Sequence, residues 1–178
     1  MKQVIDAILF AATNHAGQFR KDGVTPYINH PIEVMHFLAF TADISDEEIL
    51  MAAVLHDVVE DTSVTVEEIA QRFGQNVADI VLELTDDISL SKEERKHQQL
   101  MACDGLSYGA KVIRISDKIC NVYDIIYAPP GDWDIHRRRA YLIWANSVIM
   151  KITGTNEGLE QHFEELMEEG FRCLEISV

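Results

Sequence analysis

The sequence is poor in several residue types, and each shortage excludes a class of protein. It has three cysteines in 178 residues, at positions 103, 120 and 173, and no two have the spacing of a zinc or redox motif. We therefore expect reduced thiols in a cytoplasmic protein. No window approaches the roughly 18 apolar residues of a membrane span. The first residues, MKQVIDAILF, lack the apolar region of a signal peptide.

Basic residues are also scarce. The chain has 15 lysines and arginines against 30 acidic residues, a formal net charge of −15. Such a surface repels nucleic acid and anionic membranes, so we expect neither as a partner. A small anionic ligand stays compatible, because a local cluster of basic side chains or a bound metal can reverse the potential inside one cleft.

What is present is a helical pattern without alternating strand runs. Near the N-terminus, Ile5, Ile8, Leu9 and Ala12 recur at helical spacing on one expected face. Capping-box spacing predicts three helix starts, at Ser45 with Glu48, Thr65 with Glu68, and Ser91 with Glu94. Asp134 and Asn156 predict two more starts, and the second opens an acidic helix over 157–172.

These signals predict an all-α fold. We expect one domain over residues 1–178, a bundle of about eight to ten helices, with the informative motifs between about 5 and 160. A homo-oligomer is compatible with the sequence.

One apolar helix is interrupted by acids. Residues 54–62 read VLHDVVEDT, which places His56 one helical turn before Glu60, and Asp57 one turn before Asp61. Burying these groups is costly unless they are paired or metal-bound, and an imidazole with carboxylates suits manganese, iron, zinc or magnesium. A partly exposed helix end with solvated acids has the same spacing, so both readings stay open on spacing alone.

Two distant residues favour the metal. His30, in YINHP, opens a helix, and Asp117, in RISDKICNVYD, interrupts an apolar helix face. Each also has a purely structural interpretation: His30 as a structural histidine, and Asp117 as an aspartate paired with Lys118 or Arg114.

Together these segments resemble the HD-domain phosphohydrolase superfamily, whose metal ligands occur in the order H…HD…D. The strings HAGQFRKDGVTPYINHP, HDVVEDT, FGQNVADIVLELTDD, SKEERK and SDKICNVYD look like the hydrolase domain of the Rel/SpoT alarmone enzymes. They look even more like the short stand-alone Mesh-type small alarmone hydrolases. The resemblance covers residues 5–160, and the chain is too short for the synthetase and regulatory domains of the long members.

The resemblance implies an enzyme that binds a small nucleotide. The family removes the 3′-pyrophosphate of ppGpp or pppGpp with Mn²⁺, giving GDP or GTP and pyrophosphate. Two alternatives stay within the superfamily: an adenosine alarmone as the main substrate, and the 2′-phosphate of NADPH. A catalytically dead binding module is a third reading, but such a relative is expected to have lost a motif residue, and here all are present.

The resemblance also assigns residues. The implied metal ligands are His30, His56, Asp57 and Asp117. Glu60 is assigned to orienting and deprotonating the nucleophile, and Asp61 to assisting it or protonating the leaving group. The implied substrate-binding residues are Arg20, Lys21, Lys92, Arg95, Asn121, Arg137 and Tyr141.

Within that set, Arg20 is expected to pack on the purine and Lys21 to lie near phosphate or base. Lys92 and Arg95 are expected to hold the distal pyrophosphate, with Lys96 a weaker candidate. Asn121 and Tyr141 are assigned to the ribose and Arg137 to phosphate. Trp144 is expected in the core, and the remaining histidines are expected to be structural or solvated: His15, His36, His97, His136 and His162.

Overall fold

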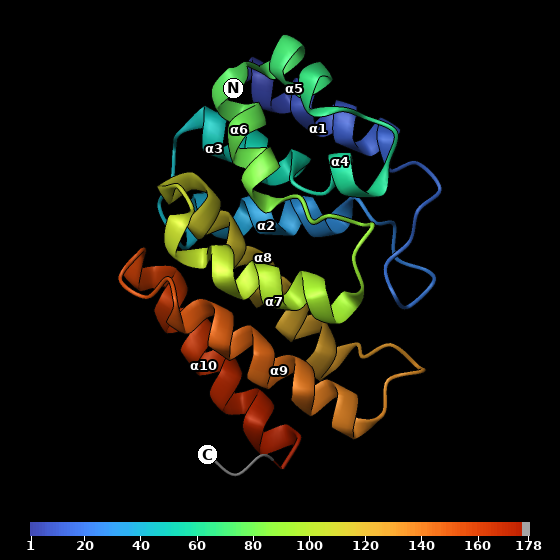
Figure 1. Cartoon of the computed structure of the whole chain (residues 1–178), viewed down its shortest axis with the longest axis vertical. Coiled ribbons are helices and arrows are strands. Elements are labelled where there is room, and N and C mark those ends of the chain that lie inside the picture. The colour runs from blue at the N-terminus through green and yellow to red at the C-terminus, as the bar shows by residue number, and fades with distance from the viewer. Residues whose placement is uncertain (176–178) are drawn as a thin grey trace.

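The computed structural model describes residues 1–175, and this part of the chain is helical (Figure 1). The prediction of an all-α fold is confirmed: in residues 1–175 the β-structure is limited to one isolated bridge, between Phe19 and Pro26. The elements in chain order are α1 (Lys2–Asn14), α2 (Asn29–Phe40), α3 (Glu47–Leu55), α4 (Val58–Asp61), α5 (Val66–Phe73), α6 (Gln75–Leu84), α7 (Lys92–Ala102), the 3-10 turn η1 (Cys103–Gly105), α8 (Tyr108–Tyr127), α9 (Ile135–Met150) and α10 (Glu157–Cys173).

Helices α3 and α8 organise the packing. Helix α3 contacts α1, α2, α6 and α8, whereas α8 contacts α2, α6, α9 and α10. In Figure 1, α1, α3 and α6 lie toward the end of the molecule that carries the N-terminus, α2 and α8 lie across the middle, and α9 and α10 lie at the opposite end. The long helix α8 therefore joins the two ends, with α2 beside it. Within residues 1–175, no helix is both long and apolar enough to cross a bilayer.

Helix starts follow the capping signals in most cases. The reciprocal capping boxes of Thr65 with Glu68 and Ser91 with Glu94 are both present, and Asp134 and Asn156 cap α9 and α10 through their side chains. Helix α10 covers the acidic segment expected over 157–172.

The predicted cap at Ser45 is wrong. Asp46 is the N-cap of α3, and its carboxylate accepts hydrogen bonds from the backbone N–H groups of Glu48 and Ile49, at 2.8 and 3.4 Å. A carboxylate at this position also interacts favourably with the positive end of the helix dipole. Glu48, freed from the capping box, accepts a hydrogen bond from Asn76 instead.

The apolar face that the spacing identified on α1 is only partly buried. Ile5 and Leu9 are 60% and 63% exposed, and the buried residues are Val4, Ala7 and Ala11. Apolar residues lie on both sides of this helix, so periodicity did not identify its inner face. The small alanines face inward, where α1 packs against α3.

The expected continuous helix through VLHDVVEDT is interrupted. Helix α3 ends at Leu55 and α4 begins at Val58, although His56 and Asp57 keep right-handed helical dihedral angles. The His56 ring nitrogen Nδ1 donates to the carbonyl of Ala53 at 2.8 Å, so this side chain competes for a helix carbonyl. The Asp61 N–H still bonds the Asp57 carbonyl at 2.9 Å. The expected one-turn separation of these two residues is thus preserved.

Candidate metal centre and active-site cleft

A cleft of about 880 Å³ opens where α2, α4, α7, α8 and α9 meet. Every residue that the sequence assigned to a site lines it: Arg20, Lys21, His30, His56, Asp57, Glu60, Asp61, Lys92, Arg95, Asp117, Asn121, Arg137 and Tyr141. They come from segments far apart in the chain, so the fold gathers them into one place.

The buried end of the cleft contains two imidazoles and two carboxylates. One ligand atom each from His30, His56 and Asp117 lies within 4.8 Å of the others. The Nε2 atom of His30 is 3.1 Å from Asp117 Oδ1 and 3.7 Å from Asp57 Oδ2. The Nε2 atom of His56 is 3.1 Å from Asp57 Oδ2 and 3.9 Å from Asp117 Oδ1. Each imidazole therefore faces both carboxylates.

The donor set fits a divalent cation. Because His56 Nδ1 donates to the Ala53 carbonyl, the lone pair of His56 is on Nε2 when the ring is neutral. That buried Nε2 has no hydrogen-bond partner among the described residues. Burial opposes a charge on this ring, but the Asp57 carboxylate outweighs it and raises the pKa of His56 to about 9. The cluster thus attracts positive charge, and imidazole with carboxylate is a common set for divalent transition metals.

Three neighbouring donors hold the carboxylates in place. The Tyr27 hydroxyl donates to Asp57 Oδ2 at 2.6 Å, Asn121 Nδ2 donates to Asp117 Oδ1 at 2.6 Å, and Lys118 Nζ donates to Asp117 Oδ2 at 2.8 Å. Such outer partners orient metal ligands. Lys118 was one of the two partners expected for Asp117. The sequence reading missed Tyr27, although it belongs to the PY motif that carries the resemblance.

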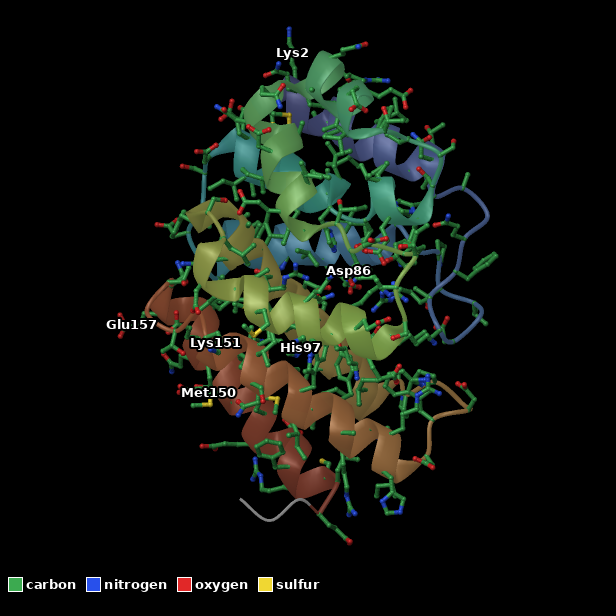
Figure 2. All side chains as sticks on the ribbon, in the orientation of Figure 1. Lys2, Asp86, His97, Met150, Lys151 and Glu157 are labelled. Carbon is green, nitrogen blue, oxygen red and sulfur yellow. The ribbon has the colours of Figure 1, made fainter. Side chains whose placement is uncertain are left out.

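Glu60 and Asp61 lie beside this cluster, on the short helix α4. Glu60 Oε1 accepts from Arg95 at 3.2 Å, and Oε2 accepts from the backbone N–H of Asp86 at 3.2 Å. Asp86 lies on the loop between α6 and α7, at the middle of the molecule in Figure 2. Burial raises the pKa of Glu60 to about 7, and burial together with the charge of Asp57 raises the pKa of Asp61.

The cleft concentrates the scarce basic residues. Eight of the fifteen lysines and arginines line it, against seven of the thirty acidic residues. The basic residues are Arg20, Lys21, Lys92, Arg95, Lys96, Arg114, Lys118 and Arg137. The strongly negative protein therefore has one region with a slight excess of positive side chains.

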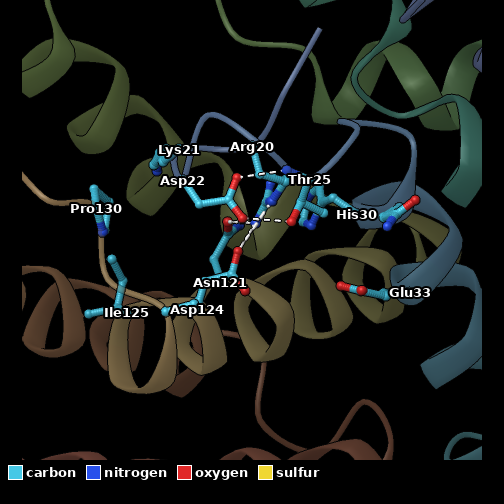
Figure 3. Close-up of a pocket in the computed structure, with 12 residues that line it drawn as sticks. Arg20, Lys21, Asp22, Thr25, His30, Glu33, Asn121, Asp124, Ile125 and Pro130 are labelled. Carbon is cyan, nitrogen blue, oxygen red and sulfur yellow. Dashed lines mark hydrogen bonds and ion pairs between the residues drawn. The ribbon is translucent and has the colours of Figure 1, made fainter.

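An ion pair and hydrogen bonds orient Arg20 at the wall of the cleft. Its guanidinium donates to Asp124 Oδ2 at 2.5 and 3.2 Å and to Asn121 Oδ1 at 3.3 Å. Figure 3 shows these bonds at the wall of a second, smaller pocket of about 160 Å³, which also contains Glu33. Lys21 Nζ lies 4.9 Å from the centre of the Trp133 ring.

Comparison with known proteins identifies the fold and its relatives. Residues 7–130 match the family model described as HD domain. The chain belongs to the HD domain family. It is 44% identical to the guanosine-3′,5′-bis(diphosphate) 3′-pyrophosphohydrolase MESH1 of Mus musculus and 42% identical to that of Homo sapiens, over 94% of both chains in each case. A solved structure of a metazoan SpoT ortholog described as hydrolysing ppGpp superposes with a TM-score of 0.92 at 40% identity, covering 95% of this chain and 96% of that one.

The sequence placed Trp144 in the core and five histidines outside the site, and the structure can be compared with both predictions. Trp144, expected in the core, packs against the core but also lines the cleft, and its Nε1 donates to the Lys96 carbonyl at 3.3 Å. The five histidines outside the motif do not line the cleft. Tyr141 is buried, with its ring packed between those of Trp133 and Trp144.

Proposed function

We propose that this HD-domain protein hydrolyses the 3′-pyrophosphate of ppGpp or pppGpp, giving GDP or GTP and inorganic pyrophosphate. The observation that carries the proposal is that a buried His–Asp cluster shares one cleft with eight of the fifteen basic side chains of an otherwise acidic protein. Relatives at 44% and 42% identity, named for the same reaction, support it.

His30, His56, Asp57 and Asp117 would hold the metal, and we propose Mn²⁺ as the ion. When bound, a divalent cation of this kind polarises the phosphoryl group and makes a water molecule more acidic. The chain itself fixes the ligands through Tyr27, Asn121 and Lys118.

Proton transfer falls to the acid pair beside the cluster. With a pKa of about 7, Glu60 is partly ionised at neutral pH, which suits a general base that takes a proton at a carboxylate oxygen. The Asp86 N–H and the Arg95 guanidinium restrict the orientation of Glu60. Asp61 either assists it or protonates the leaving group, and its raised pKa favours carrying a proton.

Nucleotide binding is assigned to the basic and aromatic walls. The Arg20 plane, held by Asp124 and Asn121, would stack on the purine, with Lys21 near phosphate or base. Asn121 and Tyr141 would contact the ribose and Arg137 a phosphate. Lys92 and Arg95 would approach the distal pyrophosphate.

Two further proposals concern the setting of the protein. A single continuous core supports the proposal that residues 1–178 form one domain. The free thiols of Cys103, Cys120 and Cys173 support a reducing, cytoplasmic environment.

The test supplies purified protein and Mn²⁺ with ppGpp, ppApp or NADPH in separate reactions and resolves products by anion-exchange chromatography. We expect pyrophosphate and GDP from ppGpp. Pyrophosphate from ppApp alone, or phosphate from NADPH alone, would instead establish one of the alternative substrates. Absence of pyrophosphate from both alarmones would contradict the proposal.

Variants separate the role of the metal ligands from that of the acid pair Glu60 and Asp61. The double variant Glu60→Ala/Asp61→Ala should lose turnover but keep most metal binding, whereas Asp57→Ala should lose the metal. Glu164→Ala, which removes an exposed acid from α10, is the matched control and should behave as the unmodified protein. Turnover by the double variant would refute the assignment of the acid pair.

A further inference from the structure

Arg114, on α8, is a buried cation without an ion-pair partner in the part of the chain that the structure describes. Its residue surface is only 7% exposed, yet it lines the cleft. Its Nε is buried without a hydrogen-bond partner. The ion pairs that the carboxylates of the cleft form within residues 1–175 involve other cations, among them Arg95 with Glu60 and Lys118 with Asp117. A buried charge of this kind is costly unless a counter-charge occupies the space that it faces.

Two lysines add to the positive charge beside it. Lys118 follows Arg114 by one helical turn and is 3% exposed. Its Nζ lies 4.8 Å from the centre of the Trp144 ring, and Lys96 Nζ lies 4.9 Å from the same centre. Burial lowers the pKa of Lys96, and the charges of Arg137 and Lys118 contribute to that lowering. Asp117 pairs with Lys118, but the group as a whole retains excess positive charge.

The order of residues along α8 places Arg114 and Asn121 on opposite sides of Asp117. Asn121, which bonds Arg20, follows Asp117 by four residues, and Arg114 precedes Asp117 by three. At 1.5 Å of rise per residue, Asn121 and Arg114 lie about 6 Å and about 4.5 Å along the helix axis on opposite sides of Asp117. A substrate whose nucleoside lies near Arg20 and whose reacting phosphate lies near Asp117 extends its distal phosphate toward Arg114.

We propose that Arg114, Lys118 and Lys96 form an anion subsite that binds the departing pyrophosphate. The identity of this anion rests on the proposed function, whereas the existence of the subsite rests on the unpartnered guanidinium. The sequence assigned the distal pyrophosphate to Lys92 and Arg95. Because Arg95 already pairs with Glu60 at 3.2 Å, Arg114 is better placed to supply a free charge.

The subsite can be tested without turnover, using inorganic pyrophosphate as the probe and thermal unfolding as the readout. EDTA is added so that any binding reflects the side chains of the protein. The proteins compared are the unmodified chain, Arg114→Gln, Arg114→Lys and the control Lys111→Gln. Lys111 lies on the same helix one turn earlier and does not line the cleft.

We expect pyrophosphate to raise the melting temperature of the unmodified protein more than equimolar phosphate does. Arg114→Gln should weaken pyrophosphate binding on the order of 10- to 100-fold, the usual loss for charged hydrogen bonds. Arg114→Lys should retain part of the binding and Lys111→Gln all of it. Without ligand, Arg114→Gln should melt no lower than the unmodified protein, because it removes an unpaired buried charge.

Equal pyrophosphate binding by Arg114→Gln and the unmodified protein would overturn the proposal, as would absence of binding by the unmodified protein. Failure of both Arg114 variants to fold would also overturn it, by showing a structural role. Hydrolysis of ppGpp is measured separately. A protein that binds pyrophosphate through Arg114 but leaves ppGpp intact would refute the proposed function and retain the anion subsite.

Discussion

The hydrogen bond from Tyr27 to Asp57 should control metal affinity. The Tyr27 hydroxyl lies 2.6 Å from Asp57 Oδ2, the oxygen that also faces both His30 and His56. Burial and the neighbouring Asp57 charge raise the pKa of Tyr27 well above its ordinary value, so the phenol stays protonated and remains a donor. Tyr27→Phe removes this donor and leaves the ring in place.

The expected loss can be bounded from this one bond. A hydrogen bond to a charged group contributes about 1.5–3 kcal/mol, and about 1.4 kcal/mol corresponds to a tenfold change in affinity. Without the phenol, the Asp57 carboxylate is free to turn toward solvent, and metal binding must then reorder it. The loss is therefore at most on the order of 100-fold, and measured effects of outer partners on metal affinity, about 10- to 100-fold, fall in this range.

Calorimetric titration of the metal-free protein with Mn²⁺ measures the effect directly. We expect Tyr27→Phe to bind about tenfold or more weakly. The matched control is Tyr123→Phe, which removes the hydroxyl of a tyrosine that is 54% exposed and lies outside the cleft. If Tyr27→Phe binds Mn²⁺ within twofold of the unmodified protein, Asp57 does not depend on the phenol for its orientation, and the reasoning is refuted.

Two further predictions concern stability. The pKa of Glu60 is raised from 4.5 to about 7, so the metal-free folded state binds more protons than the unfolded state between these values, and stability should fall as pH rises through this window. Solvent screening at this half-buried site limits the effect to about 1 kcal/mol. Because the pKa of Asp61 is also raised, Glu60→Gln should reduce the fall in urea titrations without abolishing it, and an unchanged profile would contradict the assignment. Asp46→Ala should lower the free energy of unfolding by about 1 kcal/mol through loss of the α3 cap, whereas Ser45→Ala should lower it little. A larger loss for Ser45→Ala than for Asp46→Ala in thermal melts would show that Ser45 caps α3, as the sequence predicted.

The sequence predicted helix starts correctly where only one nearby residue could act as the cap. Thr65 with Glu68 and Ser91 with Glu94 each close a capping box within four residues, so no distant contact is needed to place the helix start. At Ser45 the neighbouring Asp46 is an equally good cap, and the local pattern could not choose between them. On α1 apolar residues occur on both faces, and only packing against α3 shows that Ala7 and Ala11 face inward.

The candidate site divides along similar lines. Spacing within VLHDVVEDT suggested a metal, but the joining of His30 and Asp117 to it came from resemblance, since no local rule links residues 87 positions apart. Arg114 shows most clearly what the sequence could not predict. The sequence offered it as a partner for Asp117, yet Lys118 takes that position, and only the packed structure shows a guanidinium left without a counter-charge.

The charge balance of the cleft links metal binding to nucleotide binding. Its eight basic and seven acidic side chains nearly cancel, while the chain as a whole has a net charge of −15. Without a divalent cation, the cleft as a whole has little net attraction for a nucleotide that must approach a negative protein, and the attraction for phosphate groups is local to the side chains of Arg114, Lys118 and Lys96. With two further positive charges at the His–Asp cluster, the balance of the cleft becomes clearly positive. Because such coupling is reciprocal, bound nucleotide should in turn strengthen metal binding. The negatively charged surface repels a polyphosphate, so the polyphosphate binds preferentially in the cleft that contains the metal.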